Sequence, residues 1–250
     1  MKRPLLIGAA VVLATAAVAG FLVMRSLDDQ TAATSDDVMA EFRKEAGPAK
    51  TGDLAGVAPQ GVYSYRVKGH EKIVRALTIE RDLPTEATMM VFHRDGGFDT
   101  RTIFSREHVE DAHYAVAPDG AYLTKAVTTI SAGPIRTVRE RDWNPRLLRF
   151  PAKSHAPWGG AYQAGDIAMT VKAREEAPEE VDVAGTAVKA RVFSFHQIAS
   201  GEYSGTRDET FWVDGETGIL LRYRIVSSLT GPTNLDFTAD QTLTSMTPRT

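Results

Sequence analysis

Residues 211–225 read FWVDGETGILLRYRI and form the clearest β-hairpin signal in the chain. Phe211 and Val213 fall on one face of the first arm, and alternate positions of the return arm, residues 219–225, are all apolar. The arginines between those positions point the other way, toward water. Because successive side chains of a strand face opposite sides, this pattern predicts two half-buried antiparallel strands joined by a turn at residues 214–218.

The same alternation extends outward from this hairpin over most of the chain. Further strands are expected at 63–67, 73–80, 85–93, 98–104, 121–130, 135–141, 167–175, 188–196 and 237–246, with glycine-rich turns between them. Strands at this spacing without intervening helices predict a mainly β fold. We therefore expect one antiparallel β-sheet domain over residues 61–250, arranged as a half-barrel, a barrel or a sandwich.

The first 25 residues carry a different signal. Residues 4–24 form an uncharged apolar run, preceded by Lys2 and Arg3 and followed by Arg25. A run of about 20 apolar residues matches the thickness of a bilayer core, so we expect a transmembrane signal-anchor helix within residues 1–25. The basic N-terminal flank predicts a cytoplasmic N-terminus and an extracytoplasmic C-terminal domain. The alternative is a cleaved signal peptide with a cleavage site after residues 17–19, which places the domain on the same side.

A short helix and a linker are expected between the membrane segment and the sheet, over residues 26–60. Ser35 or Asp36 can cap a helix at 37–45, with Val38, Met39 and Phe42 on one face. Residues 49–60 are rich in Gly, Ala, Pro and Thr, which is typical of a flexible tether.

Composition excludes several classes of function. The chain has no cysteine, so neither a disulfide framework nor a lipidated cysteine is available. It carries 29 Lys and Arg against 32 Asp and Glu, and the excess of acidic residues makes nucleic acid an unexpected partner.

No catalytic or metal-binding motif is evident. His108 and His113 are five residues apart, a spacing that fits neither a helical turn nor one face of a strand, and we expect a polar loop there. The serines lie outside any nucleophile elbow, and the acidic residues at 175–180 suggest a solvated hairpin tip. We therefore expect no enzyme activity, no metal and no cofactor, although a hydrolase with an unrecognised site stays a third hypothesis.

Aromatic residues concentrate in one proline-rich region, residues 139–162. The four ligand-binding candidates are Trp143, Phe150, Trp158 and Tyr162. Because prolines favour irregular backbone, we expect these side chains on a loop or on the rim of the sheet. They would form either the mouth of an apolar pocket or a contact surface, or else an aromatic plug that closes one end of the core.

Three segments, residues 61–65, 211–222 and 243–248, carry a resemblance. In this order, behind a membrane anchor, they resemble uncharacterised actinobacterial membrane-anchored envelope proteins. The hairpin also looks like those of lipoprotein-carrier half-barrels of the LolA and LppX kind. That second resemblance implies a curved sheet that encloses acyl chains beneath covering helices.

Two functions follow as expectations. The first is non-enzymatic binding of an apolar small molecule or lipid by an extracytoplasmic β domain anchored in the cell membrane through residues 4–24. The alternative is a protein–protein interaction module that docks another cell-envelope protein, for example through an exposed strand edge.

Overall fold

A single antiparallel sheet dominates the structure. The computed structural model describes residues 30–46, 56–75, 78–132 and 135–250, which contain one helix, α2 (Ser35–Glu45), and a 14-stranded sheet. The strands are β1 (Gly61–Val74), β2 (Thr78–Asp82), β3 (Glu86–Arg94), β4 (Gly97–Ser105), β5 (His108–Ala117), β6 (Gly120–Ala132), β7 (Ile135–Pro151), β8 (Trp158–Ala164), β9 (Ile167–Glu175), β10 (Glu179–Val183), β11 (Thr186–Gly201), β12 (Ser204–Asp214), β13 (Leu220–Thr230) and β14 (Asn234–Leu243).

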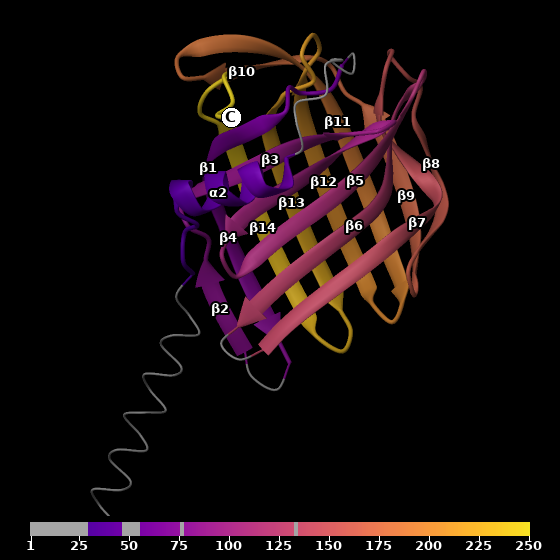
Figure 1. Cartoon of the computed structure of the whole chain (residues 1–250). Helices are drawn as coiled ribbons and strands as arrows, with labels where there is room; N and C mark the ends of the chain where they lie inside the picture. Colours follow the sequence, from indigo (N-terminus) through magenta and orange to yellow (C-terminus); the bar gives the residue numbers. More distant parts are fainter. Residues whose placement is uncertain (1–29, 47–55, 76–77, 133–134) are drawn as a thin grey trace, which may run out of the picture.

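Twelve of the strands in this described part of the chain close into a barrel (Figure 1). Their order is β11-β12-β13-β14-β1-β3-β4-β5-β6-β7-β8-β9, and β9 pairs with β11 to complete the circle. β10 pairs with the first residues of β11, and β2 pairs with the second half of β1, so both lie beside the circle. Among the three expected arrangements, the structure is a barrel.

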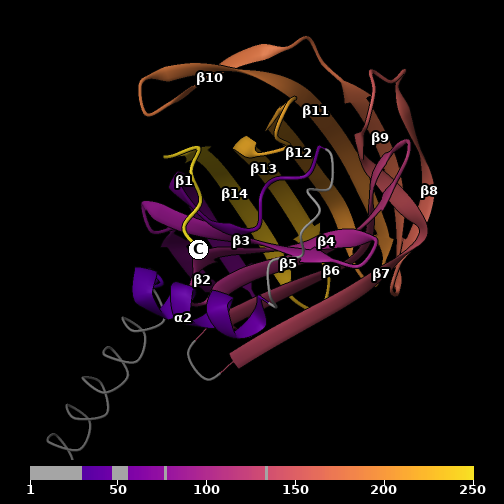
Figure 2. The same cartoon turned by 45° about the horizontal axis from the view of Figure 1, so that its top comes forward.

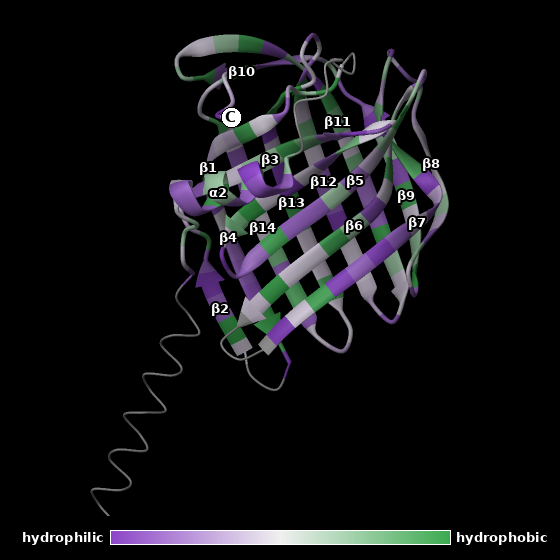
Figure 3. Ribbon diagram, viewed as in Figure 1, coloured by the Kyte–Doolittle hydropathy of each residue, from purple (hydrophilic) through white to green (hydrophobic). Residues whose placement is uncertain are grey.

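The hairpin at residues 211–225 forms as predicted. β12 and β13 pair antiparallel, and Leu221, Tyr223 and Ile225 are buried while Arg224 is exposed. Figure 3 shows the same alternation of hydrophobic and hydrophilic residues along many of the strands. The turn of this hairpin lies close to the chain before β1: a Cβ on Gly218, whose φ is +73°, would lie 2.2 Å from the carbonyl oxygen of Gly56. Only glycine fits both that backbone angle and that approach.

Helix α2 covers part of the outside of the barrel. Its buried residues Val38, Met39 and Phe42 pack against side chains of β1, β3 and β4. Arg101 of β4 fixes the helix further, because its Nη1 atom lies 2.6 Å from Glu41 and 2.8 Å from Glu45. The expected apolar face is confirmed, but the cap differs: the Thr34 hydroxyl accepts the hydrogen bond from the Asp37 backbone N–H.

Three predicted boundaries were wrong. The stretch expected as one strand at 73–80 contains the end of β1 and the start of β2, which pair with each other. Residues 108–113, expected as a polar loop, belong to strand β5. The expected linker extended to residue 60, but Val57 and Ala58 are buried in the main core.

The expected transmembrane segment, residues 4–24, lies outside the described residues. Within the described ranges, no helix is both long enough and apolar enough to cross a membrane.

Candidate ligand cavity

A cavity of about 460 Å³ lies inside the barrel. Its lining includes residues of most barrel strands, together with the chain at 56–58 and the β12–β13 turn. Those two segments lie at the end of the barrel that carries β10, which comes forward in Figure 2. The volume is within the range of pockets that hold small molecules, roughly 300–1,000 Å³.

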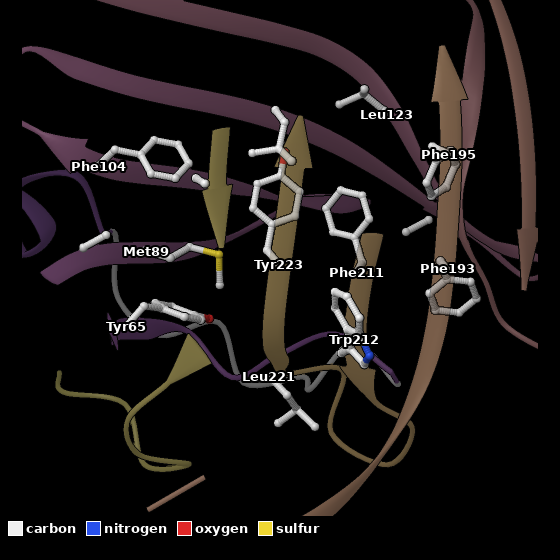
Figure 4. Packing of buried hydrophobic residues seen from close by; sticks show 14 of the residues in the cluster. Tyr65, Met89, Phe104, Leu123, Phe193, Phe195, Phe211, Trp212, Leu221 and Tyr223 are labelled. Carbon is white, nitrogen blue, oxygen red and sulfur yellow. The ribbon is translucent and has the colours of Figure 1, made fainter. Parts of the chain in front are cut away.

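Aromatic rings form a layer across this cavity. Phe150 of β7 contacts Tyr114, Phe193 and Phe211, with ring centroids 5.9, 5.8 and 5.4 Å apart respectively. Phe98 of β4 stacks on Tyr114 at 4.6 Å. Figure 4 shows Phe193 and Phe211 on adjacent strands within the buried cluster. Edge-to-face rings of this kind offer an apolar surface to a ligand.

Charged side chains form a second layer next to the aromatic one. Along β12, Arg207 and Glu209 precede Phe211 at alternate positions, and all three line the cavity. Arg207 and Arg149 of β7 lie 3.1 and 2.5 Å from the Glu209 carboxylate, which also accepts a hydrogen bond from Tyr223 at 2.6 Å. Burial alone would raise the pKa of Glu209, but the two arginines hold it well below its usual range.

Glu110 extends this ion-pair network to β5. Its carboxylate lies 3.1 Å from Arg207 and 3.8 Å from His108. Despite burial, Arg207 and His108 keep the pKa of Glu110 far below its usual value, so the carboxylate is ionised.

Arg141 of β7 differs from the other cations of the cavity. It lines the cavity and is half-buried, yet it makes no ion pair or hydrogen bond with the residues that the structure describes. Burial and the nearby Arg207 lower the pKa of its guanidinium to about 10, against a smaller opposing effect of Glu110. Its charge is therefore poorly compensated.

Beyond the charged layer, toward the end that carries β2, the interior is filled. His108 lies 2.9 Å from Glu71, which also pairs with Arg81 at 2.8 Å, and all three side chains are buried. His108 packs on Phe237 with ring centroids 4.5 Å apart, and Phe104 lies 5.2 Å from Phe237. These residues are not part of the cavity lining.

The four aromatic candidates separate into two pairs. All lie in strands β7 and β8, so of the two expected places, a loop or the rim of the sheet, the loop was wrong. Phe150 and Trp143 line the cavity. Trp158 and Tyr162 do not line the cavity but pack against the core. The Trp158 ring lies 5.8 Å from the Phe195 ring, and the Tyr162 ring lies 5.8 Å from the Trp143 ring. That any of them binds a ligand stays a prediction.

Sequence reasoning missed the charged layer. Glu209 lies on the same strand face as Phe211, which was predicted to be buried, and Arg207 is one further step along that face. Charged residues in phase with a buried aromatic were the available signal. Within the ranges described, no three His, Asp or Glu residues are placed to hold a metal ion.

Comparisons with known proteins identify no family for this chain. No family model matches the chain, and no curated protein matches it either. Among solved structures, the hypothetical lipoprotein YmcC from Escherichia coli (K12) matches with 11% identity and a TM-score of 0.33, over 83% of this chain and 97% of that one. A TM-score this low carries no argument about this protein. The resemblance to actinobacterial envelope proteins is still a prediction.

Proposed function

We propose that this protein binds an apolar small molecule or lipid inside its barrel, at the cell envelope, without catalysing a reaction. The observation that supports the proposal is the cavity of about 460 Å³ beneath a layer of aromatic rings. The apolar run at residues 4–24 supports a position at the membrane.

The size of the cavity limits the ligand. If each non-hydrogen atom takes about the volume of one water molecule in the liquid, roughly 30 Å³, the cavity accommodates a ligand of about 15 such atoms. A single alkyl chain of medium length fits this limit. Burying such a chain against aromatic rings is favourable by about 25 cal/mol for each Å² of apolar surface removed from water.

The test is equilibrium dialysis of the whole chain with radiolabelled dodecanol, a neutral ligand of suitable size. The chain is held in an amphipathic polymer, so that no detergent monomer competes, and polymer alone gives the blank. We expect saturable binding of one dodecanol for each protein. Native mass spectrometry of the same sample, followed by solvent extraction, would identify any apolar molecule that co-purifies.

A matched pair of variants locates the binding. Ala112 lines the cavity on β5, whereas Ala161 is exposed on β8. Ala112→Phe fills the cavity and should abolish dodecanol binding, and Ala161→Phe should leave it unchanged. No saturable binding by the unmodified protein, or equal binding by both variants, would rule out a ligand inside the barrel.

A further inference from the structure

One cation of the cavity lining has no partner among the residues that the structure describes. Arg141 makes no ion pair with any described residue, although it lines the same cavity as Arg207 and lies on the same strand, β7, as the ion-paired Arg149. An unpaired charge in a partly dehydrated site is costly, because the interior replaces little of its lost hydration. Such a residue is a candidate binding site for an anionic group that the folded chain does not itself supply.

The charged side chains around Arg141 support the binding of an anionic group there. Arg149 and Arg207 are ion-paired with Glu209 and Glu110, and His108 is a further cation 3.8 Å from Glu110, so both carboxylates already have cationic partners and Arg141 is left in excess. The other charged groups of the lining lie apart from this cluster. Asp111 is held by Arg101, and Arg191, Asp214 and Glu216 lie near the β10 end, where Arg191 is held by Glu175.

A second unsatisfied donor lies close to Arg141 in the chain. Trp143 is two residues further along β7 and also lines the cavity, and its indole N–H is buried without a hydrogen-bond acceptor among the described residues. Buried N–H groups of tryptophan usually find a partner. Two unsatisfied donors so close together on one cavity wall point to an acceptor.

The aromatic layer provides an apolar surface for the part of the ligand beyond its anionic group. Along β5, Ala112, Tyr114 and Val116 follow Glu110 at alternate positions of the lining, so this face of the strand changes from charged to apolar toward the β10 end. β12 shows the same change from Arg207 and Glu209 to Phe211. The wall is thus charged at depth and apolar at the level of the aromatic layer.

We propose that the ligand is a single-chain amphiphile with a carboxylate, and that Arg141 binds this carboxylate while the alkyl chain lies against the aromatic layer. The inference rests on the proposed function and deepens it. A carboxylate carries one negative charge and matches the guanidinium of Arg141, which is unpaired among the described residues. A phosphate monoester carries about 1.5–2 negative charges at neutral pH, more than one guanidinium neutralises.

The experiment compares three ligands with the same alkyl chain. Dodecanoate, dodecanol and dodecyl phosphate are dialysed against the whole chain in amphipathic polymer at pH 7.5, and again against the variants Arg141→Gln and Arg136→Gln. Arg136 is the matched control, because it lies on the same strand but is exposed to solvent. Ion-paired hydrogen bonds contribute about 1.5–3 kcal/mol, which corresponds to at least about tenfold in affinity.

The expected result is that the unmodified protein binds dodecanoate at least about tenfold more tightly than dodecanol or dodecyl phosphate. Arg141→Gln should lose this preference and keep its affinity for dodecanol, and Arg136→Gln should behave as the unmodified protein. Retained affinity for dodecanol also shows that the variant is folded.

Three results would overturn the inference. Equal affinity for dodecanoate and dodecanol would show that the cavity does not recognise an anionic head group, and the proposed function would still stand. If Arg141→Gln keeps the preference for dodecanoate, Arg141 does not bind the carboxylate. If dodecyl phosphate binds more tightly than dodecanoate, the head group is not a carboxylate. If none of the three ligands binds, the proposed function fails together with the inference.

Discussion

At the β2 end of the barrel interior, Arg81 and His108 both contact Glu71, whereas in the cavity Arg141 has no acidic partner among the described residues. The two regions also differ in packing, since Phe237 lies among other rings while Phe98 borders open volume. Both regions therefore bury charge and aromatic surface, but only the cavity holds a cation, Arg141, without an ion pair among the described residues. The difference separates side chains whose partners lie within the barrel from those to which we assign the proposed ligand.

Truncating a phenylalanine in each region should test the difference in packing. Phe237→Ala should lower the free energy of unfolding by about 4 kcal/mol, because the surrounding rings cannot collapse into the space. Phe98→Ala should cost less, about 2 kcal/mol, because part of its surface already faces the cavity. Urea denaturation measures both. Equal losses would mean that the two regions are packed alike.

Removing a partner from the filled end should cost nearly as much. Arg81→Met leaves Glu71 with His108 as its remaining cationic contact, and we expect a loss of about 3 kcal/mol on urea denaturation. The control is Arg94→Met, which breaks the more exposed ion pair with Asp99 and should cost less than about 1 kcal/mol. A loss at Arg81 as small as the control would show that the buried pair adds no stability.

His108 should make the stability of the filled end depend on pH. Burial alone would lower its pKa, but Glu110 and Glu71 outweigh burial and raise the pKa to about 9. Because this is above the value of about 6.5 in an unfolded chain, the contribution is complete below about pH 6.5 and is lost as the pH rises through 9. Its size is on the order of 3 kcal/mol.

Urea denaturation between pH 6 and 9.5 measures this effect. The fall in the free energy of unfolding with rising pH should be smaller in His108→Gln. It should be unchanged in His70→Gln, because His70 is on the protein surface. An unchanged slope in His108→Gln would assign the pH dependence to another group.

The smallest expected effect has the opposite sign. Arg141→Met removes an unpaired, half-buried charge, so in the absence of ligand we expect the free energy of unfolding to rise by about 1 kcal/mol. Thermal denaturation of ligand-free protein measures this change. A clear loss of stability would mean that Arg141 has a structural partner and belongs with the filled end.

The sequence predicted the fold class but not the arrangement of the interior. Alternation identified the hairpin at residues 211–225 because its buried positions are apolar. It failed at 108–113, where the buried face carries His108 and Glu110, whose charges are compensated by residues distant in the chain. Local patterns cannot reveal such pairing. For the same reason Arg149, which pairs with Glu209, gave no signal, although the neighbouring Phe150 did.

One junction in the barrel wall has a further consequence. Only Trp143 and Asn144 of β7 pair with β8, whereas β7 pairs with β6 over most of its length. Further along, the indole of Trp158 donates to the carbonyl oxygen of Leu148 at 2.8 Å, so a side chain joins the two strands where the backbone ladder does not. Because few backbone hydrogen bonds hold this seam between β7 and β8, we expect it to open locally more readily than the rest of the wall and its amide hydrogens to exchange faster with solvent. Trp158→Phe keeps the ring but removes this bond, and hydrogen–deuterium exchange should then accelerate along residues 146–151 alone.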